Sequence, residues 1–287
     1  MTRLTSTRLT SWTRDGLVFD VRDSGALDGE VVVCLHGFPQ DGTAYDDVAR
    51  LLAADGLRVL VPDQRGYSPG ARPESRSAFA VEALADDVVG LLDAAGVAQA
   101  HVVGHDWGGA IAWFLGSRRS DRVRSLTVLS TAHPAAMRAD LMHGQGLRSA
   151  YMVAFQLPVL PELAVSLAGG RAFAAGLRRS GLNPERAAHY TSRMREPGAM
   201  SAALGWYRSI PASAGHGAGR VRVPTAYVVG RRDPFFSSGS VRRTAELVTG
   251  PYRVVELDEG HWLPENRAED VAAAVRTQVA GDLTPGR

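Results

Sequence analysis

Three side chains in this sequence have the types and the chain order that covalent catalysis by a carboxylate requires. Asp106 stands in "HVVGHDWGGA", where an apolar run turns into a helical pattern, the corner at which the pattern G-x-S-x-G places a serine nucleophile. Asp233 follows in "VVGRRDPF" and His261 in "LDEGHWLPE", each just after a later apolar run. We therefore interpret Asp106 as a nucleophile, Asp233 as the acid that orients a base, and His261 as that base.

These residues meet only if the strands that precede them end at one edge of a sheet. Short β-branched runs alternate with longer segments of helical periodicity, which predicts an α/β fold with a mostly parallel central sheet flanked by helices. The predicted strands are Val31–Leu35, Arg58–Val61, His101–Val103, Leu126–Leu129, Thr225–Val229 and Arg253–Leu257. The clearest predicted helices are Ala44–Ala53, Ala78–Ala95, Trp107–Gly116 and Ala268–Val279.

The alternation stops between His133 and roughly Arg220, where the chain is rich in Ala, Leu and Arg and has no β-rich run. We predict a helical cap (lid) of residues 134–215, inserted into a core made of residues 1–133 and 216–287. Active sites of open α/β sheets lie at the carboxyl ends of the strands, so a cap there would enclose a pocket.

Composition excludes several other classes of protein. The 287 residues are 45% hydrophobic and 22% charged, as in an ordinary globular protein and unlike a disordered chain. The basic residues are all arginine and lie scattered among the acidic ones, for a net charge of +2, so no nucleic-acid partner is expected. The single cysteine, Cys34, lies in the apolar run "VVVCL" and is expected to be a small buried hydrophobe.

Metal ions, cofactors and membranes are not expected. The histidines are dispersed without a metal-binding spacing, so we expect neither a metal nor another cofactor. The first sixteen residues have no apolar signal region, and no apolar segment approaches the ~20 residues of a membrane span. The sequence predicts a cytoplasmic enzyme, either a monomer or a homodimer.

Four segments together resemble the α/β-hydrolase superfamily over nearly the whole chain: "VVVCLHGFPQ", "VLVPDQRGYSPGARP", "VVGHDWGGAIAW" and "GHWLPE". The resemblance implies that "HGFP" is the oxyanion-hole loop, with the backbone N–H groups of Phe38 and Trp107 directed at the oxygen where charge develops. The side chains of His36 and Gln40 are expected to brace this loop. Asp258 and Glu259 are rival acids near His261, but neither follows a strand at the expected place.

An aspartate at this corner, in place of a serine, limits the reactions that the site could catalyse. A carboxylate displaces a leaving group at saturated carbon and forms an ester whose carbonyl belongs to the enzyme. Water activated by His261 would then attack the Asp106 carbonyl, while the oxyanion hole stabilises the charge. Epoxides and alkyl halides both suit this chemistry.

Tyrosines in the insertion distinguish the two substrates. An epoxide oxygen becomes an alkoxide and benefits from a phenolic O–H donor, whereas a halide needs N–H donors. Tyr151 in "YMVAFQLPVLPE" and Tyr207 in "GWYRSI" resemble the cap segments that carry the ring-opening tyrosine pair of epoxide hydrolases, whereas Tyr190 has no such match. We therefore predict an epoxide hydrolase that converts a small hydrophobic epoxide and water to a vicinal diol. The pocket residues expected are Phe38, Trp107, Phe155 and Trp262.

Two alternatives remain open. A haloalkane dehalogenase would use the same Asp106, and the indole of Trp107 could hold a halide, although such enzymes usually place a second donor where this chain has Phe38. Fluoroacetate dehalogenases have arginines just after the nucleophile, where this chain has Trp107 and Ala110, which disfavours a small acidic substrate. The other alternative is a non-catalytic ligand-binding protein on the same scaffold.

Overall fold

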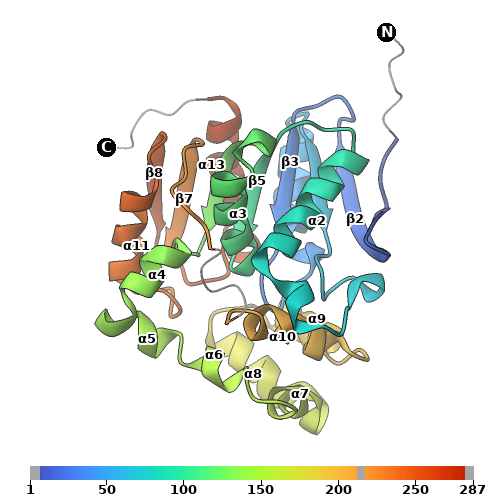
Figure 1. Cartoon of the computed structure of the whole chain (residues 1–287), viewed down its shortest axis with the longest axis vertical. Coiled ribbons are helices and arrows are strands. Elements are labelled where there is room, and N and C mark those ends of the chain that lie inside the picture. Colours follow the sequence, from blue (N-terminus) through green and yellow to red (C-terminus); the bar gives the residue numbers. More distant parts are fainter. Residues whose placement is uncertain (1–6, 212–216, 282–287) are drawn as a thin grey trace.

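An eight-stranded sheet forms the centre of the molecule in the computed structural model, which describes residues 7–211 and 217–281 (Figure 1). The strands are β1 (Ser11–Arg14), β2 (Leu17–Gly25), β3 (Val31–Leu35), β4 (Arg58–Pro62), β5 (Ala100–His105), β6 (Val123–Leu129), β7 (Thr225–Gly230) and β8 (Tyr252–Leu257). Their order is β1-β2-β4-β3-β5-β6-β7-β8, and all pairs from β4 to β8 are parallel. The predicted α/β class and all six predicted strands are confirmed.

The first two strands were not predicted. β1 and β2 form an antiparallel hairpin, and β2 pairs antiparallel with β4 at that edge of the sheet. The turn between them is Asp15-Gly16, with both residues at positive φ, which is a typical hairpin signal. The exposed side chains of Asp20 and Arg22 alternate with the buried side chains of Phe19 and Val21 in β2, because one of its faces is exposed. That alternation hid the strand from a search for continuous β-branched runs.

Helices cover both faces of the sheet. On one side lie α2 (Val81–Ala94) and α3 (Trp107–Arg118), and on the other lie α1 (Asp46–Ala54) and α13 (Ala268–Val279) (Figure 1). Alternate residues of β3 divide between the two cores: Val33 packs on the α2–α3 side and Cys34 on the α1–α13 side. Cys34 is fully buried and free, as expected for a small core residue.

Between β6 and β7, the described residues 134–211 contain helices and no strand. The α-helices are α4 (Pro134–Ala139), α5 (Gln145–Arg148), α6 (Tyr151–Ala154), α7 (Leu160–Ser166), α8 (Arg171–Arg179), α9 (Pro184–Met194) and α10 (Ala199–Arg208). α4 packs against α11 (Ser238–Thr244) beside the sheet, whereas α6 to α10 lie beyond one end of the strands (Figure 1).

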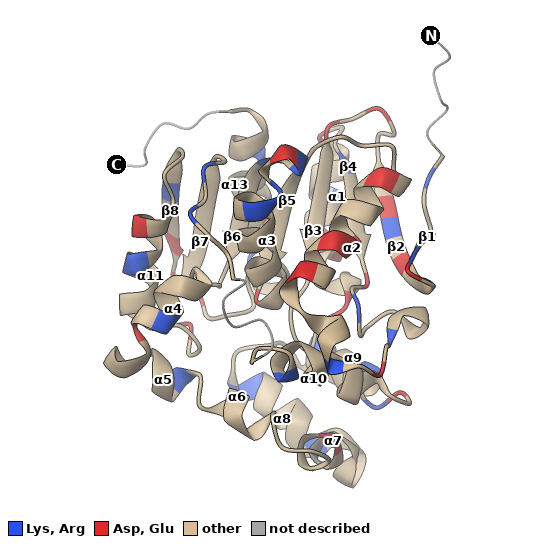
Figure 2. Cartoon of the chain, viewed as in Figure 1, with Lys and Arg blue, Asp and Glu red and all other residues tan. Residues whose placement is uncertain are grey.

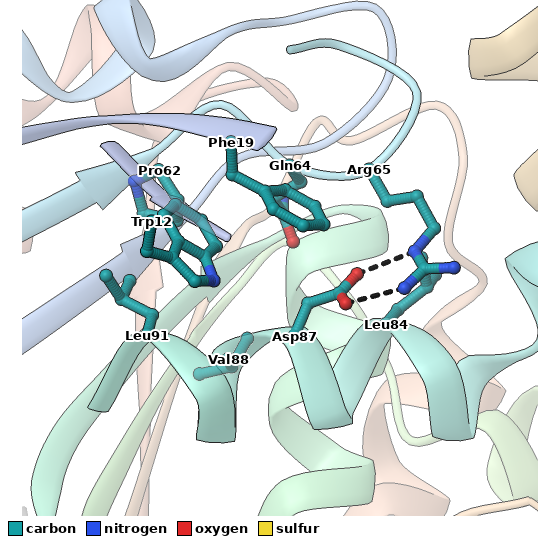
Figure 3. A pocket seen from close by; sticks show the side chains of 9 residues that line it. All are labelled: Trp12, Phe19, Pro62, Gln64, Arg65, Leu84, Asp87, Val88 and Leu91. Atoms are coloured by element: carbon teal, nitrogen blue, oxygen red, sulfur yellow. Dashed lines mark hydrogen bonds and ion pairs between the residues drawn. The ribbon is translucent and has the colours of Figure 1, made fainter. Parts of the chain in front are cut away.

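A buried ion pair fixes the loop after β4, on which α10 rests. The Arg65 guanidinium donates two hydrogen bonds to the Asp87 carboxylate, at 2.7 and 2.6 Å, beside a small cavity of about 10 Å³ (Figure 3). Both side chains are more than nine-tenths buried. The backbone carbonyl of Arg65 in turn accepts a hydrogen bond from the indole of Trp206 in α10, at 2.9 Å. The pair therefore connects α2 to the helical segment.

Asp87→Asn should lower the free energy of unfolding by about 3–5 kcal/mol, because it leaves a buried guanidinium without its countercharge. Asp47→Asn is the matched control: Asp47 pairs with Arg50 at 3.2 Å, but both side chains are more than half exposed. That change should cost less than about 1 kcal/mol. Urea unfolding measures both, and equal effects would show that the buried pair has no special role.

Candidate active site

The corner between β5 and α3 holds Asp106 in a conformation that only a tight local structure can maintain. Its φ is 51° and its ψ is −119°, a region that costs a non-glycine residue about 1–3 kcal/mol. A Cβ on Gly104 would overlap the backbone of Gly108, and a Cβ on Gly108 would overlap the backbone of Leu35. These glycines let α3 approach the sheet closely, so that the Asp106 side chain projects from the turn.

Backbone donors surround one side of the Asp106 carboxylate. The Phe38 N–H donates to Asp106 Oδ1 at 2.8 Å, and the Trp107 N–H also hydrogen-bonds to the carboxylate. Burial raises the pKa of Asp106 above its usual value, although the charge of His261 and the two N–H groups oppose that rise. The two donors are therefore placed to stabilise negative charge on an oxygen of this carboxyl group.

Side chains behind the Phe38 loop hold it in place. Gln40 Oε1 accepts a hydrogen bond from the Gly37 N–H at 2.7 Å, and His36 Nε2 accepts one from the Gln64 N–H at 3.1 Å. His36 and Gln40 are fully buried and neither lines the cavity described below, which agrees with the expectation that they brace the loop.

His261 lies between the two aspartates of the predicted set. Its Nδ1 is 2.8 Å from Asp233 Oδ2, and its Nε2 is 3.8 Å from Asp106 Oδ2. Asp233 Oδ1 accepts a hydrogen bond from the Phe235 N–H at 2.8 Å, which fixes the carboxylate. The rival Asp258 is instead exposed and paired with Arg232. The structure thus brings Asp233, rather than its rival, to the imidazole.

The electrostatics of His261 follow from this arrangement. Burial disfavours the imidazolium, but the charge and the hydrogen bond of Asp233 outweigh burial and raise the pKa of His261 above its usual value. The Nδ1–H is held by Asp233, so Nε2 is the nitrogen that can accept a proton on the Asp106 side.

A further buried polar group behind His261 was missed by sequence reasoning. His105, the last residue of β5, has Nε2 at 2.9 Å from the His261 carbonyl oxygen and Nδ1 at 2.8 Å from Gln40 Oε1. Gln40 Nε2 donates to Glu265 Oε1 at 2.8 Å. These contacts connect the loop of His261 to the loop of Phe38. Their long sequence separations leave no local signal from which they could have been found.

The two predicted tyrosines come together opposite Asp106. The ring centroids of Tyr151 in α6 and Tyr207 in α10 are 6.1 Å apart, and both rings line the same cavity as Asp106. Burial, with the nearby Asp106 charge, raises the pKa of each phenol far above its usual value, so both keep their protons as donors. Tyr190 does not line this cavity, and its hydroxyl donates to Glu265 at 2.9 Å.

The side chain of Trp107 is not in the pocket lining, where it was predicted, although its backbone N–H contacts Asp106 as expected. Its ring packs edge-on against Tyr207, with the centroids 5.1 Å apart, and its side chain forms a hydrogen bond with that residue. Trp107 is not among the residues that line the cavity. Because it follows the corner directly, its side chain is carried with the start of α3 into the aromatic packing of α10.

The cavity next to Asp106 has a volume of about 390 Å³. Of the predicted pocket residues, Phe38, Phe155 and Trp262 line it. Its other lining residues are Pro39, Asp106, Tyr151, Ala172, Phe173, Gly176, Leu177, Ser180, Tyr207, Phe235 and His261. The α8 residues were missed, although their spacing in "RAFAAGLRRS" places them on one helical face.

Within residues 7–211 and 217–281, no group of three or more His, Cys, Asp or Glu side chains is arranged to hold a metal ion. No helix in the same ranges has the length and apolar character needed to cross a membrane. Acidic and basic residues are intermixed along the described part of the ribbon in Figure 2.

Comparisons with known proteins agree with this architecture. Residues 30–268 match the family model for the alpha/beta hydrolase fold. AB hydrolase superfamily protein YfhM of Bacillus subtilis is 31% identical, over 87% of this chain and 90% of that protein. Epoxide hydrolase A of Mycobacterium tuberculosis is 30% identical, over 93% of this chain and 95% of that protein. The crystal structure of epoxide hydrolase A from Mycobacterium thermoresistibile superimposes with a TM-score of 0.82 at 25% identity, covering 94% of this chain and 97% of that one. The chain therefore belongs to the α/β-hydrolase fold family and, within it, to the epoxide hydrolase family.

Proposed function

We propose that this protein hydrolyses a small hydrophobic epoxide to a vicinal diol through an ester on Asp106. The observation that carries the proposal is that the Asp106 carboxylate and the phenols of Tyr151 and Tyr207 line one largely apolar cavity. A nucleophile and two proton donors at the wall of one cavity provide for attack on carbon and for the departing oxygen together.

Ring opening uses the face of the carboxylate that the backbone leaves free. Oδ1 accepts the Phe38 N–H, so Oδ2 is the oxygen that attacks an oxirane carbon. The carbon–oxygen bond of the ring breaks, and the oxygen takes a proton from a phenol of the Tyr151–Tyr207 pair. The product is a hydroxyalkyl ester of Asp106 and a phenolate.

Hydrolysis of the ester uses the other half of the site. His261 Nε2 takes a proton from water, and the hydroxide adds to the Asp106 carboxyl carbon. The N–H groups of Phe38 and Trp107 stabilise the resulting oxyanion. Collapse releases the diol and the carboxylate, and the two protons of the water end on the leaving diol oxygen and on the phenolate. No cofactor enters this scheme.

The helical segment acts, in this proposal, as a cap of residues 134–215 over a core of residues 1–133 and 216–287. The support is that α6, α8 and α10 supply cavity residues opposite Asp106 and His261. The boundary between residues 215 and 216 lies outside the described residues. α4 packs on α11, so the start of the segment is attached to the core.

The same geometry gives less support to the two alternatives. A halide would need N–H donors in the cavity, but the Trp107 side chain is not part of the lining and Phe38 brings an apolar ring. A binding protein without catalysis has no use for a base held at 2.8 Å from an orienting carboxylate.

A substrate panel tests the proposal directly. The purified protein should convert racemic styrene oxide to the diol and release no halide from 1-chlorohexane, with activity unchanged by a metal chelator. Halide release without diol formation would favour a dehalogenase. Binding of styrene oxide without any turnover would favour a ligand-binding protein.

The pH dependence follows from the pKa of His261. Only the neutral imidazole can take a proton from water, so ester hydrolysis should increase as pH rises through the raised pKa, and the acidic limb of the kcat profile should lie above pH 6.5. Asp233→Asn removes the charge that raises this pKa. The acidic limb of the variant's kcat profile should therefore move to lower pH, and kcat itself should fall. A limb that stays in place in Asp233→Asn would contradict the proposed role of Asp233.

A further inference from the structure

The large hydrophobic side chains that the fold leaves exposed are concentrated in one part of the helical segment. Nine of the thirteen in the described residues lie between Leu141 and Leu167, and among them Met142 is 91% exposed and Leu147 is 87% exposed. This stretch covers α5, α6 and α7, on the side of the molecule away from the sheet (Figure 1). Exposed leucines scattered singly need no explanation, whereas a concentration of them indicates a surface that contacts a partner.

α7 carries apolar side chains on two faces. Pro161 and Val165 are buried, whereas Leu160, Leu163 and Leu167 are exposed. The three leucines recur at helical spacing along α7 and at its end, so they form an outward stripe where a surface helix ordinarily has polar residues. We call these three leucines the α7 stripe.

The residue before α7 holds another apolar side chain outward, in a strained conformation. Val159 has a φ of 70°, in the left-handed region that favours glycine and is rare for a β-branched residue. Its side chain is 60% exposed, so packing within the described residues does not offset the strain. Because strained residues cluster at functional sites, the backbone of Val159 is a second indication, besides exposure, that this surface has a partner.

The charges around the α7 stripe indicate the chemistry of that partner. Residues 134–211 contain nine arginines and four acidic residues, a net charge of +5 in a chain whose total is +2. Arg171, Arg178 and Arg179 are exposed on α8, which packs against α7, and Arg195 is exposed near the segment that joins these two helices. None of the four forms an ion pair with a described carboxylate. Their guanidinium groups are therefore available to anionic groups of a partner.

We propose that the α7 stripe and these four arginines bind the surface of a bilayer that contains anionic lipids. Exposed leucines insert at the boundary between headgroups and acyl chains, while guanidinium groups bind the lipid phosphates. Contact of this kind is confined to the bilayer surface and needs no spanning segment. It departs from the expectation, drawn from the sequence, that membranes play no part. A second copy of the chain fits less well, because a two-fold interface would bring the same unpaired arginines of both copies together.

Co-sedimentation of the full chain with large vesicles tests the proposal. The protein should bind vesicles made of equal parts of phosphatidylcholine and phosphatidylglycerol, should not bind phosphatidylcholine alone, and should be released as salt is raised. Leu163→Gln/Leu167→Gln should weaken binding on the order of 10-fold, because it removes apolar area that the bilayer buries. Arg178→Gln/Arg179→Gln should weaken binding by about 25-fold at low salt, since each arginine near an anionic surface contributes about 5-fold. Circular dichroism checks that both variants fold.

Leu27→Gln and Arg222→Gln/Arg242→Gln are the matched controls. Leu27 is an exposed leucine between β2 and β3, and Arg222 and Arg242 are exposed arginines outside the helical segment that form no ion pair with a described carboxylate. Both control variants should bind vesicles as the natural protein does.

Three results would overturn the proposal. The first is a natural protein that stays in the supernatant with anionic vesicles, and the second is equal binding by all four variants. The third is a dimer in sedimentation velocity that only Leu163→Gln/Leu167→Gln dissociates, without binding to vesicles, which would make the surface an interface between copies of the chain. Epoxide turnover plays no part in these readouts, so membrane binding and the proposed function can fail independently.

Discussion

Asp106→Ala should reduce epoxide hydrolysis by roughly 10⁴- to 10⁶-fold, the loss typical when a covalent nucleophile is removed. The variant has no carboxylate to attack carbon, and the imidazole Nε2 of His261, which lies 3.8 Å from Asp106 Oδ2 in the natural protein, is a base and cannot replace the carboxylate as the nucleophile of the ester route. The measurement is the rate of diol formation, with circular dichroism as a check on folding.

Asp258→Ala is the control for the loss of a carboxylate. Asp258 is exposed and paired with Arg232 at 3.5 Å, outside the cavity. Its kcat should match that of the natural protein. An Asp106→Ala variant that retains more than a tenth of the activity would show that water or another residue attacks the epoxide directly.

Replacing both phenols should have the second largest effect. Tyr151→Phe and Tyr207→Phe should each lower kcat/KM by about 10- to 100-fold, because the remaining phenol still serves the oxygen. The double variant should lose on the order of 10³- to 10⁴-fold, because no O–H donor then faces Asp106 across the cavity. Steady-state rates on styrene oxide measure this.

Tyr252→Phe is the matched control for the tyrosine changes. Tyr252 lies in β8, and its buried hydroxyl has no hydrogen-bond partner among the described residues. Its removal should leave kcat/KM unchanged. The double variant could instead have a kcat/KM no lower than that of the more impaired single variant. That result would show that the two phenols do not both donate to the epoxide oxygen.

The core of the fold and the proximity of Asp106, Asp233 and His261 were predictable from local sequence. A parallel strand buried on both faces leaves a continuous apolar run, as in β3. The strands β5, β7 and β8 end shortly before Asp106, Asp233 and His261, respectively. The glycines around Asp106 indicate, within a few residues of sequence, that α3 packs closely against the sheet. These signals need no knowledge of distant contacts.

Other features depend on contacts that a linear sequence does not display. The side chain of Trp107 follows α3 into the packing around Tyr207, which only the placement of α10 decides. The link from Glu265 through Gln40 to His105 joins residues far apart in the chain. Which side of α8 faces the cavity was equally hidden, because its apolar residues could have packed on the core instead.

The most direct test of the covalent route is a single turnover in ¹⁸O-labelled water with enzyme in excess over styrene oxide. The ester mechanism takes the oxygen of the first diol from Asp106, so that diol should be unlabelled and the label should be found by mass spectrometry in the peptide that contains Asp106. Labelled diol in the first turnover, with an unlabelled Asp106 peptide, would contradict the account.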